Sequence, residues 1–309
     1  MEYQEISGSG IIASTIALGF WRAGKDPAFD AAGLIGAAMD VGINFFDHAD
    51  VYGRGKSEEI FGDAVDWTPA RREAAIIQTK CGIRPEANGT YYDSSREHIL
   101  ASVHGSLKRL KTDYIDILLI HRPDALMEPD EVAAAFAELH RQGKVRCFGV
   151  SNMRPGQMEL LARSLPFRLA VNQLQFSVCH SGLVESGLAS NMELEQSDSK
   201  DGEVLDYCRL NNITVQAWSP LQYGNFKGTF IENDDFPDLN RELKALAEKY
   251  SVSPAAIAAA WILRHPARIQ VIAGTGNPEH LRDFAAASEV TLERSEWYRL
   301  FRASGKILP

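Results

Sequence analysis

The chain has 309 residues, 45% of them hydrophobic, so it is long enough to bury a sizeable core without disulfides or structural metals. Its formal net charge of -9, from 32 Lys and Arg against 41 Asp and Glu, gives no support to nucleic acid or an anionic membrane as a partner. No apolar run approaches the roughly 20 residues that cross a bilayer, the N-terminus is unlike a secretory signal, and the 4 cysteines are scattered, so we expect a cytoplasmic protein with free thiols.

The first half of the chain alternates short apolar strands with helical patterns. Residues 28–41 predict a helix, because apolar residues recur there at helical spacing and Gly42 then provides a stop. Ser94 and Glu97 have the spacing of a capping box at the start of a second helix, and Pro129 suits the first turn of a third. The strands predicted around these helices are 14–19, 43–47, 75–80, 114–121 and 145–150.

The second half continues the same alternation. Near-continuous apolar strands that alternate with helices are typical of a parallel sheet covered on its outer face. Eight strand-like segments fit a closed (β/α)8 TIM barrel, an α/β fold occupying residues 1–309 as a single domain, better than an open doubly wound sheet. The segments predicted here are strands at 169–176, 213–218 and 269–273 and helices at 154–163, 203–210, 254–264 and 293–302.

Three segments do not fit the bare barrel. Residues 2–12 predict an N-terminal hairpin that closes the bottom of the barrel. Residues 178–202 and 222–237 are long loops after strands six and seven, and loops of this length are usually lids or binding loops. Because both follow strands, we expect them to hang over the active face and to set specificity together with residues beside Trp21. The chain continues only briefly past the last predicted helix, so we expect an open pocket.

Four polar residues stand at or just after the ends of predicted strands. Asp47, Lys80 and His121 lie at strand ends, and Tyr52 follows the first of these strands by a short loop. In an α/β barrel the carboxyl ends of the strands converge on one face, which holds the chemistry. An acid, a phenol, an ammonium and an imidazole brought together there indicate proton transfer to a substrate oxygen. A metal-dependent hydrolase is the less favoured alternative, because Asp47 and His48 should point to opposite strand faces, and no metal is expected.

The stretch 42–58 resembles the signature of the aldo-keto reductase family, with Asp47, Tyr52-Gly53 and Ser57-Glu58 in the family's order. His48 stands where the family usually has threonine. Within the family, the chain looks most like the bacterial YdhF-like oxidoreductases at Gly19-Phe20-Trp21-Arg22 and His121-Arg122-Pro123-Asp124. The resemblance continues in family order through Lys80, His121, Gly149-Val150-Ser151-Asn152, Asn172-Gln173, Ala217-Trp218-Ser219-Pro220-Leu221 and Ile272-Ala273-Gly274-Thr275.

The resemblance implies an NADP-dependent reductase of small or medium aldehydes or ketones. It makes Tyr52 the general acid, Lys80 its activator, Asp47 the partner of the lysine and His121 the group that orients the carbonyl or shares in proton delivery. A free tyrosine titrates near pH 10. An ammonium at about 4 Å would favour the phenolate by roughly 4 kcal/mol at an effective dielectric near 20, which is about 3 pKa units before the offset from Asp47. We therefore expect the pKa of Tyr52 to move down towards the operating pH.

The hydride donor must be a cofactor, because no side chain supplies hydride. No Gly-rich Rossmann motif follows an early strand, whereas a glycine-rich turn with Asn277 as helix N-cap follows the last predicted strand and offers a helix N-terminus to phosphate. The resemblance assigns Ser151, Asn152 and Gln173 to the nicotinamide carboxamide and Trp218 to stacking on the ring. The remaining cofactor positions that it implies are Gly19, Trp21, Ser219, Pro220, Leu221, Gly274, Thr275, Gly276 and Asn277.

The choice between NADP and NAD depends on the pocket for the 2′-phosphate. Gly274 and His280 stand where the family usually has basic residues, and Asp283-Phe284 replaces a Glu-Asn pair. Arg282, one helical turn past Pro278, could supply the positive charge. We expect NADP with NAD possible, and a monomer or weak homo-oligomer. A nucleotide-binding redox sensor with little turnover on the same fold is the second candidate function.

Overall fold

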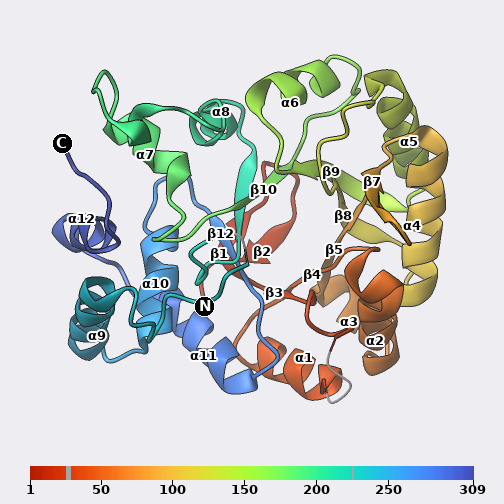
Figure 1. Ribbon diagram of the computed structural model, residues 1–309. Coiled ribbons are helices and arrows are strands. Elements are labelled where there is room, and N and C mark those ends of the chain that lie inside the picture. Colours follow the sequence, from red (N-terminus) through yellow and green to blue (C-terminus); the bar gives the residue numbers. More distant parts are fainter. Residues whose placement is uncertain (26–28, 225) are drawn as a thin grey trace.

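Eight parallel strands close into a barrel in the computed structural model, which describes residues 1–25, 29–224 and 226–309 (Figure 1). The closing contact is the parallel pairing of the first and last strands, in which Leu18 lies opposite Ala273. The predicted barrel is therefore confirmed, with strand bounds that differ from the predictions by at most two residues. The strands are β3 (Ile16–Gly19), β4 (Phe45–Asp47), β5 (Ile76–Cys81), β8 (Ile115–Ile120), β9 (Val145–Ser151), β10 (Val171–Gln175), β11 (Thr214–Trp218) and β12 (Gln270–Ala273).

Helices surround the barrel, and their apolar stripes pack on the outer faces of the strands in one continuous core (Figure 1). None of the helices within the described ranges is long and apolar enough to cross a membrane. The helices are α1 (Ala31–Asp40), α2 (Lys56–Ala64), α3 (Pro69–Ala74), α4 (Arg96–Leu110), α5 (Pro129–Arg141), α6 (Pro155–Ala162), α7 (Gly182–Leu188), α8 (Val204–Leu210), α9 (Pro237–Tyr250), α10 (Pro254–Leu263), α11 (Pro278–Ala286) and α12 (Arg294–Ala303).

Local capping explains where two predicted helices begin. The carboxylate of Asp30 accepts a hydrogen bond from the backbone N–H of Gly33, so α1 begins at residue 31. Residue 28, the predicted start, lies outside the described residues. The helix α4 is capped by Ser95 and not by Ser94 as predicted, because the Ser95 side chain accepts from the backbone N–H of residue 98. The backbone N–H of Ser94 instead donates to an Asp124 carboxylate, which holds it outside the helix.

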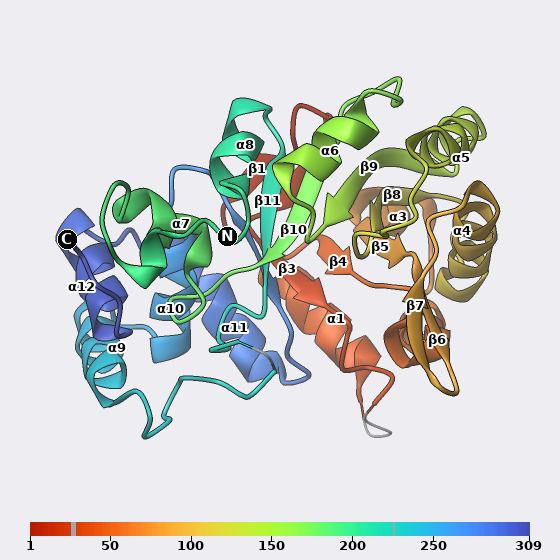
Figure 2. The ribbon, with the colours of Figure 1, turned by 45° about the horizontal axis from the view of Figure 1, so that its top comes forward.

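Two hairpins close or flank the barrel. The predicted N-terminal hairpin is present as β1 (Tyr3–Glu5) and β2 (Ile12–Ser14), and Ile6 lies in the small apolar cluster at the amino end of the strands. A second hairpin, β6 (Ile83–Glu86) with β7 (Gly89–Tyr92), follows β5 and stands beside α4 (Figure 2). It was not predicted, because its residues are almost all exposed and so show no alternation of buried and exposed positions.

The long loops after β10 and β11 are present, and the first is partly helical. It contains α7 and a short turn at Glu195–Ser197, and it is fastened to the C-terminal segment. The Gln196 side chain donates to the backbone oxygen of Ile307 at 2.7 Å, and Lys306 forms an ion pair with Glu185 at 2.9 Å. Residue 225 of the second loop lies outside the described residues.

Side chains alternate between the two faces of each strand, and this places the polar groups of the barrel interior in layers. Phe45, Ile76 and Ile117 form an apolar layer at the amino end, together with the hairpin. Two residues further along β4 and β5 come Asp47 and its register partner Gln78. The next inward position of β5 is Lys80. The strand pattern therefore directs one carboxylate, one amide and one ammonium towards the carboxyl end of the barrel.

Candidate active site

The structure brings together Asp47, Tyr52, Lys80 and His121, as the sequence predicts. The Nζ atom of Lys80 lies 2.8 Å from each carboxylate oxygen of Asp47, 2.7 Å from the backbone oxygen of residue 48 and 3.4 Å from the Tyr52 hydroxyl. The rings of Tyr52 and His121 meet edge to face with centroids 5.6 Å apart. Lys80 is fully buried and Asp47 is 3% exposed, so this ion pair lies beneath the tyrosine, out of solvent.

Each member of this tetrad is held by a barrel strand or by the turn that follows it. Asp47 ends β4, Lys80 lies one residue before the end of β5, and His121 follows β8, with its backbone N–H donating to the oxygen of residue 81 at 2.8 Å. Tyr52 begins a short 3-10 turn, and its backbone N–H donates to the oxygen of Ala49 at 3.1 Å. The strand ends thus fix the ionic pair, and the turn folds the phenol back over it.

The net shift in the pKa of Tyr52 contradicts the expected one. Burial raises the pKa of Tyr52 above 10.0, and this effect outweighs the nearby Lys80 ammonium, which lowers it, while Asp47 raises it further. Burial alone would lower the pKa of Lys80, but the Asp47 carboxylate and the tyrosine raise it above its ordinary value. At neutral pH the site therefore holds a protonated phenol beside a permanent ammonium.

His121 is neutral at the same pH. Burial holds the pKa of His121 well below its ordinary value, and the charges of Lys80 and Arg122 lower it further. Its Nδ1 atom is buried and has no hydrogen-bond partner among the described residues. A neutral imidazole can orient a substrate oxygen by hydrogen bonding, but it has no surplus proton to deliver. The lowered pKa of His121 is thus compatible with the orienting role and weighs against shared proton delivery.

His48 lies in an aromatic cluster. Its ring stacks on Phe20 with centroids 4.6 Å apart and meets the edge of Phe61 at 4.4 Å. Burial, followed by the Lys80 charge, keeps the pKa of His48 well below its ordinary value. In the part of the chain that the structure describes, no group of three or more His, Cys, Asp or Glu side chains could hold a metal ion.

The residues assigned to the nicotinamide form one connected group on β9, β10 and β11. The Ser151 hydroxyl donates to the backbone oxygen of Gln173 at 2.9 Å, and Asn152 donates through Nδ2 to the same hydroxyl at 2.8 Å. The indole N–H of Trp218 donates to the Asn152 side-chain oxygen at 3.2 Å. The amide nitrogen of Gln173 lies 3.0 Å from Asp47. This group therefore lies directly beside the tetrad.

The turn between β12 and α11 presents exposed backbone and a helix N-terminus. Asn277 caps α11 as predicted, since its side-chain oxygen accepts from the backbone N–H of residue 279 at 2.9 Å. Thr275 braces the turn by accepting from the Asn277 backbone N–H at 3.0 Å. Sequence reasoning missed Arg22, whose Nε donates to the backbone oxygen of Gly274 at 2.9 Å and brings a guanidinium to this turn. Arg282 is exposed one helical turn further on.

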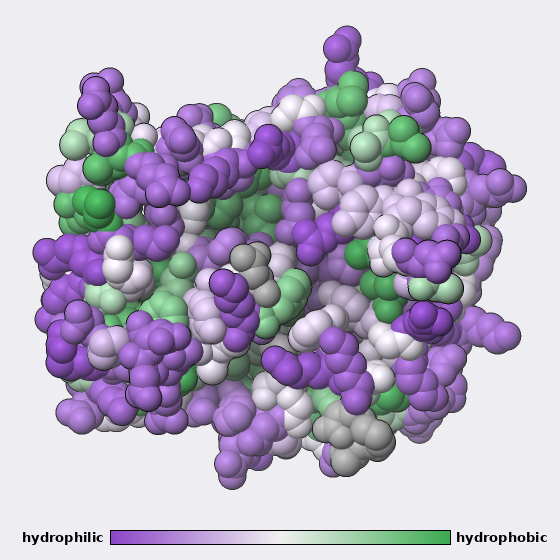
Figure 3. Space-filling view, in the orientation of Figure 1, coloured by the Kyte–Doolittle hydropathy of each residue, from purple (hydrophilic) through white to green (hydrophobic). Residues whose placement is uncertain are grey.

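An aromatic side chain of the loop after β11 reaches over the site. The ring of Phe226 stacks on Trp218 and on Trp21, with centroids 5.7 Å apart in each case. Lys25 lies 3.5 Å from the centroid of the Trp21 ring. In the space-filling view the centre of this face is hollowed, with apolar side chains recessed behind a mostly hydrophilic rim (Figure 3). Because Phe226 is itself 58% exposed, this stacking does not seal the site, and the open pocket stays a prediction.

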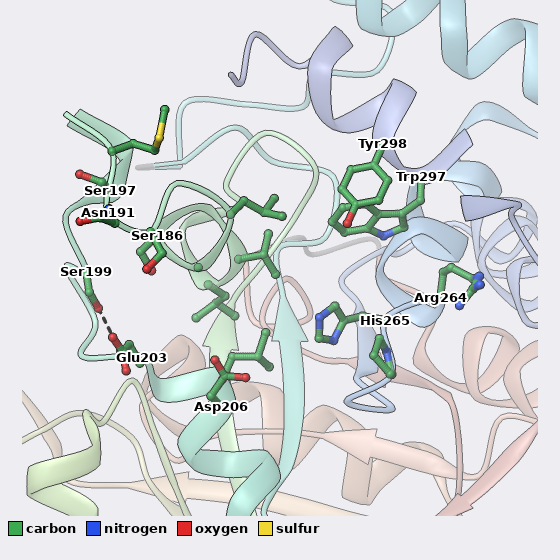
Figure 4. A pocket seen from close by; sticks show the side chains of 18 of the residues that line it. Ser186, Asn191, Ser197, Ser199, Glu203, Asp206, Arg264, His265, Trp297 and Tyr298 are labelled. Carbon is green, nitrogen blue, oxygen red and sulfur yellow. Dashed lines mark hydrogen bonds between the residues drawn. The ribbon is translucent and has the colours of Figure 1, made fainter. Parts of the chain in front are cut away.

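A second pocket, of about 780 Å³, lies away from the tetrad, between the α7–α8 segment and the ends of α10 and α12 (Figure 4). Trp297 and Tyr298 form one wall, and Arg264 and His265 lie beside them. No tetrad residue lines this pocket, so its size does not mark the reacting site.

The turn between β4 and Tyr52 holds the carboxyl group of Asp50, whose titration should change the free energy of unfolding with pH. Asp50 has one carboxyl oxygen fully buried without a hydrogen-bond partner among the described residues. Burial raises the pKa of Asp50 from 3.8 to about 7, and the buried Glu58 carboxylate adds to the increase, against lowering contributions from Ser102 and Arg109. Because the folded value exceeds the unfolded one, the folded protein binds more protons from about pH 4 to about 7, so stability falls as the pH rises through this window.

We therefore predict that Asp50→Asn stabilises the protein at high pH. The free energy of unfolding at about pH 8 should rise by at most about 4 kcal/mol relative to the parent, at roughly 1.4 kcal/mol per pKa unit, and the gap should close near pH 4. Urea unfolding across this range measures it. The exposed Asp66 offers a matched control, and Asp66→Asn should show no gap that grows with pH. A constant offset for Asp50→Asn at every pH would contradict the prediction.

Comparisons with known proteins agree with this geometry. A family model described as the aldo/keto reductase family matches residues 15–304. Three bacterial relatives match along nearly their whole length. The uncharacterized oxidoreductase YcsN of Bacillus subtilis is 39% identical over 94% of each chain. The oxidoreductase YdhF of Escherichia coli is 37% identical over 97% of this chain and 96% of its own. A 6-dehydroglucose reductase of Agrobacterium fabrum is 35% identical over 93% of each chain. A solved structure, the thermostable aldo-keto reductase Tm1743 with the inhibitor epalrestat, is 27% identical with a TM-score of 0.77, over 98% of this chain and 100% of that one.

Proposed function

Because this chain belongs to the aldo/keto reductase family, we propose that it is an NADPH-dependent oxidoreductase that reduces the carbonyl group of a small or medium aldehyde or ketone to an alcohol. The observation that supports this most is the Tyr52 hydroxyl, which lies 3.4 Å from the fully buried ammonium of Lys80. The test is turnover of an aldehyde and ketone panel with NADPH. Cofactor binding without turnover on any member would favour the second candidate, a nucleotide-binding redox sensor.

Proton transfer to the substrate oxygen is the step that the tetrad performs in this proposal. Tyr52 donates its hydroxyl proton to the carbonyl oxygen as hydride reaches the carbonyl carbon. Lys80 stabilises the phenolate that remains, Asp47 holds the ammonium in place, and neutral His121 orients the carbonyl oxygen. An alkoxide is far more basic than a phenolate, so the transfer stays favourable even though burial raises the pKa of Tyr52.

The residues beside the tetrad fit a nicotinamide dinucleotide, which when bound supplies the hydride. Gln173 directs its amide nitrogen to Asp47 and Gln216, which leaves its amide oxygen available to a carboxamide N–H. A nicotinamide stacked on the half-buried indole of Trp218 would share that ring with Phe226, whose ring centroid lies 5.7 Å away. The exposed N-terminus of α11 suits a phosphate, because its backbone N–H groups and the helix dipole favour negative charge there.

Preference for NADPH over NADH should depend on Arg282. If its guanidinium contacts the 2′-phosphate, Arg282→Met should raise the Michaelis constant for NADPH by roughly 10- to 100-fold, the scale of a charge-assisted hydrogen bond, and leave that for NADH unchanged. Arg302→Met, on the exposed face of α12, is the matched control and should change neither constant. Equal Michaelis constants for the two cofactors in the parent protein would remove the preference itself.

The substrate class can be narrowed as part of the same proposal. The similarity to a 6-dehydroglucose reductase supports including sugar-like carbonyl compounds in the panel. We further propose a single domain, a cytoplasmic location and a monomer or weak homo-oligomer. Size-exclusion chromatography with light scattering tests the last of these.

A further inference from the structure

A chain of buried glutamine side chains runs across the barrel beneath the tetrad. Gln78 donates through Nε2 to Asp47 at 2.6 Å and to Gln216 at 2.8 Å. Gln173 donates through Nε2 to the same Asp47 oxygen and to the same Gln216 oxygen, each at 3.0 Å. Gln216 in turn donates to Gln270 at 2.8 Å. Gln78, Gln216 and Gln270 are fully buried, and Gln173 is 3% exposed.

The direction of this chain is fixed from its Asp47 end. An ionised Asp47 can only accept hydrogen bonds, so Gln78 and Gln173 must both turn their amide nitrogens towards it. Their second N–H groups then require an acceptor, which is the Gln216 oxygen. Beyond Gln216, Gln270 continues the chain by donating to the backbone oxygen of Ser14 at 2.8 Å, but the orientation of Gln216 is already set by the two N–H groups that its oxygen accepts. Each amide therefore has one allowed orientation, and Gln216 is the point where the two branches meet.

We propose that Gln216 is a positioning residue of the reaction, which holds the amides of Gln78 and Gln173 in the orientation that directs both onto Asp47. This rests on the proposed function, and it gives the residue two effects at the site. The first is on the proton donor, through the hydrogen bonds to Asp47. The second is on the cofactor, because a locked Gln173 keeps its amide oxygen, and not its nitrogen, free for a ligand.

The first effect has a definite sign. Two N–H donors on one oxygen of Asp47 draw negative charge away from Lys80, so the ammonium acts more strongly on Tyr52. The other charged or titratable groups facing the phenol are His121, which is neutral, and Arg122, which lowers the pKa of Tyr52. Loss of either donor should therefore raise the pKa of Tyr52. Oxidation of the alcohol product, which needs the phenolate, should shift its pH profile to higher pH.

Three volume-matched variants separate positioning from mere packing. Gln216→Met should shift the pH profile of kcat/KM for alcohol oxidation upward by about 0.5 unit or more and should weaken NADP binding by roughly 10-fold, the scale of one lost hydrogen bond. Gln78→Met should shift the profile in the same direction with NADP affinity unchanged. Gln270→Met, equally buried but one step further from Asp47 along the chain, should change neither quantity, because Gln78 and Gln173 still orient Gln216.

The pattern across the three variants decides the outcome. Equal effects of all three, or no shift with Gln78→Met and Gln216→Met, would overturn the proposal. If Gln216→Met does not fold, the contrast between Gln78→Met and Gln270→Met still tests the effect on the proton donor. The two failures can be told apart. If the proposed function is wrong, Tyr52→Phe retains turnover. If only this inference is wrong, Tyr52→Phe is inactive and the three glutamine variants behave alike.

Discussion

Replacing Tyr52 with phenylalanine should lower kcat for carbonyl reduction by at least about 100-fold, the scale of lost general acid catalysis. The substitution removes only the hydroxyl oxygen, which lies 3.4 Å from the Lys80 ammonium. The aromatic ring remains to pack edge to face against His121. Steady-state kinetics on a reactive aldehyde, together with fluorescence titration of NADPH, measure the effect. The dissociation constant for NADPH should stay nearly unchanged, because the lost group acts on the substrate oxygen.

A second tyrosine provides the matched control for this experiment. The Tyr3 hydroxyl donates to the backbone oxygen of Gly42 at 2.8 Å, at the amino end of the barrel. Tyr3→Phe also removes one hydroxyl oxygen and its hydrogen bond, but at the end of the barrel opposite to the tetrad. Its kcat should equal that of the parent. Retained turnover in Tyr52→Phe would remove this residue as the acid, and an equal loss in both variants would indicate a general effect of losing a hydroxyl.

The convergence of three members of the tetrad could be predicted because it depends on strand ends. Asp47, Lys80 and His121 each end or follow a buried apolar run, and parallel strands in a barrel bring such positions to one face. The direction of the shift in the Tyr52 pKa could not be obtained in this way. It depends on how deeply the hydroxyl is buried, and burial outweighs the ammonium that the sequence does reveal.

The glutamine chain was equally hidden from the sequence. Gln78, Gln216 and Gln270 lie in strands far apart along the chain, and only the register places Gln173 opposite Gln216 and Gln216 opposite Gln270. A one-residue slip of any strand would turn its glutamine to the outer face. Polar residues in predicted core strands were therefore a signal that could have been used, since a buried amide must find partners.

Breaking the Lys80–Asp47 pair should have the largest effect on stability. Lys80→Met leaves the Asp47 carboxylate buried and without its cation, and this should lower the free energy of unfolding by about 3–5 kcal/mol. Asp47→Asn leaves the ammonium without its counter-charge and should be of similar size. Both single variants should also lose turnover by at least about 100-fold. Lys80→Met removes the ammonium that stabilises the Tyr52 phenolate, and Asp47→Asn removes the carboxylate that holds this ammonium in place.

The double variant Asp47→Asn with Lys80→Met separates stability from chemistry. With neither charge present, no unpaired ion remains in the barrel, so the double variant should be more stable than the sum of the single effects predicts, by about 1–3 kcal/mol. Part of the loss should persist, because the backbone oxygen of His48 no longer receives its hydrogen bond from Lys80 at 2.7 Å. Turnover should not recover at all, since a neutral pair offers nothing to stabilise the phenolate. Urea unfolding of the four proteins and kcat on one aldehyde measure both effects. If turnover recovered together with stability, the ion pair would serve only the fold, and the assignment of Lys80 as activator of Tyr52 would be wrong.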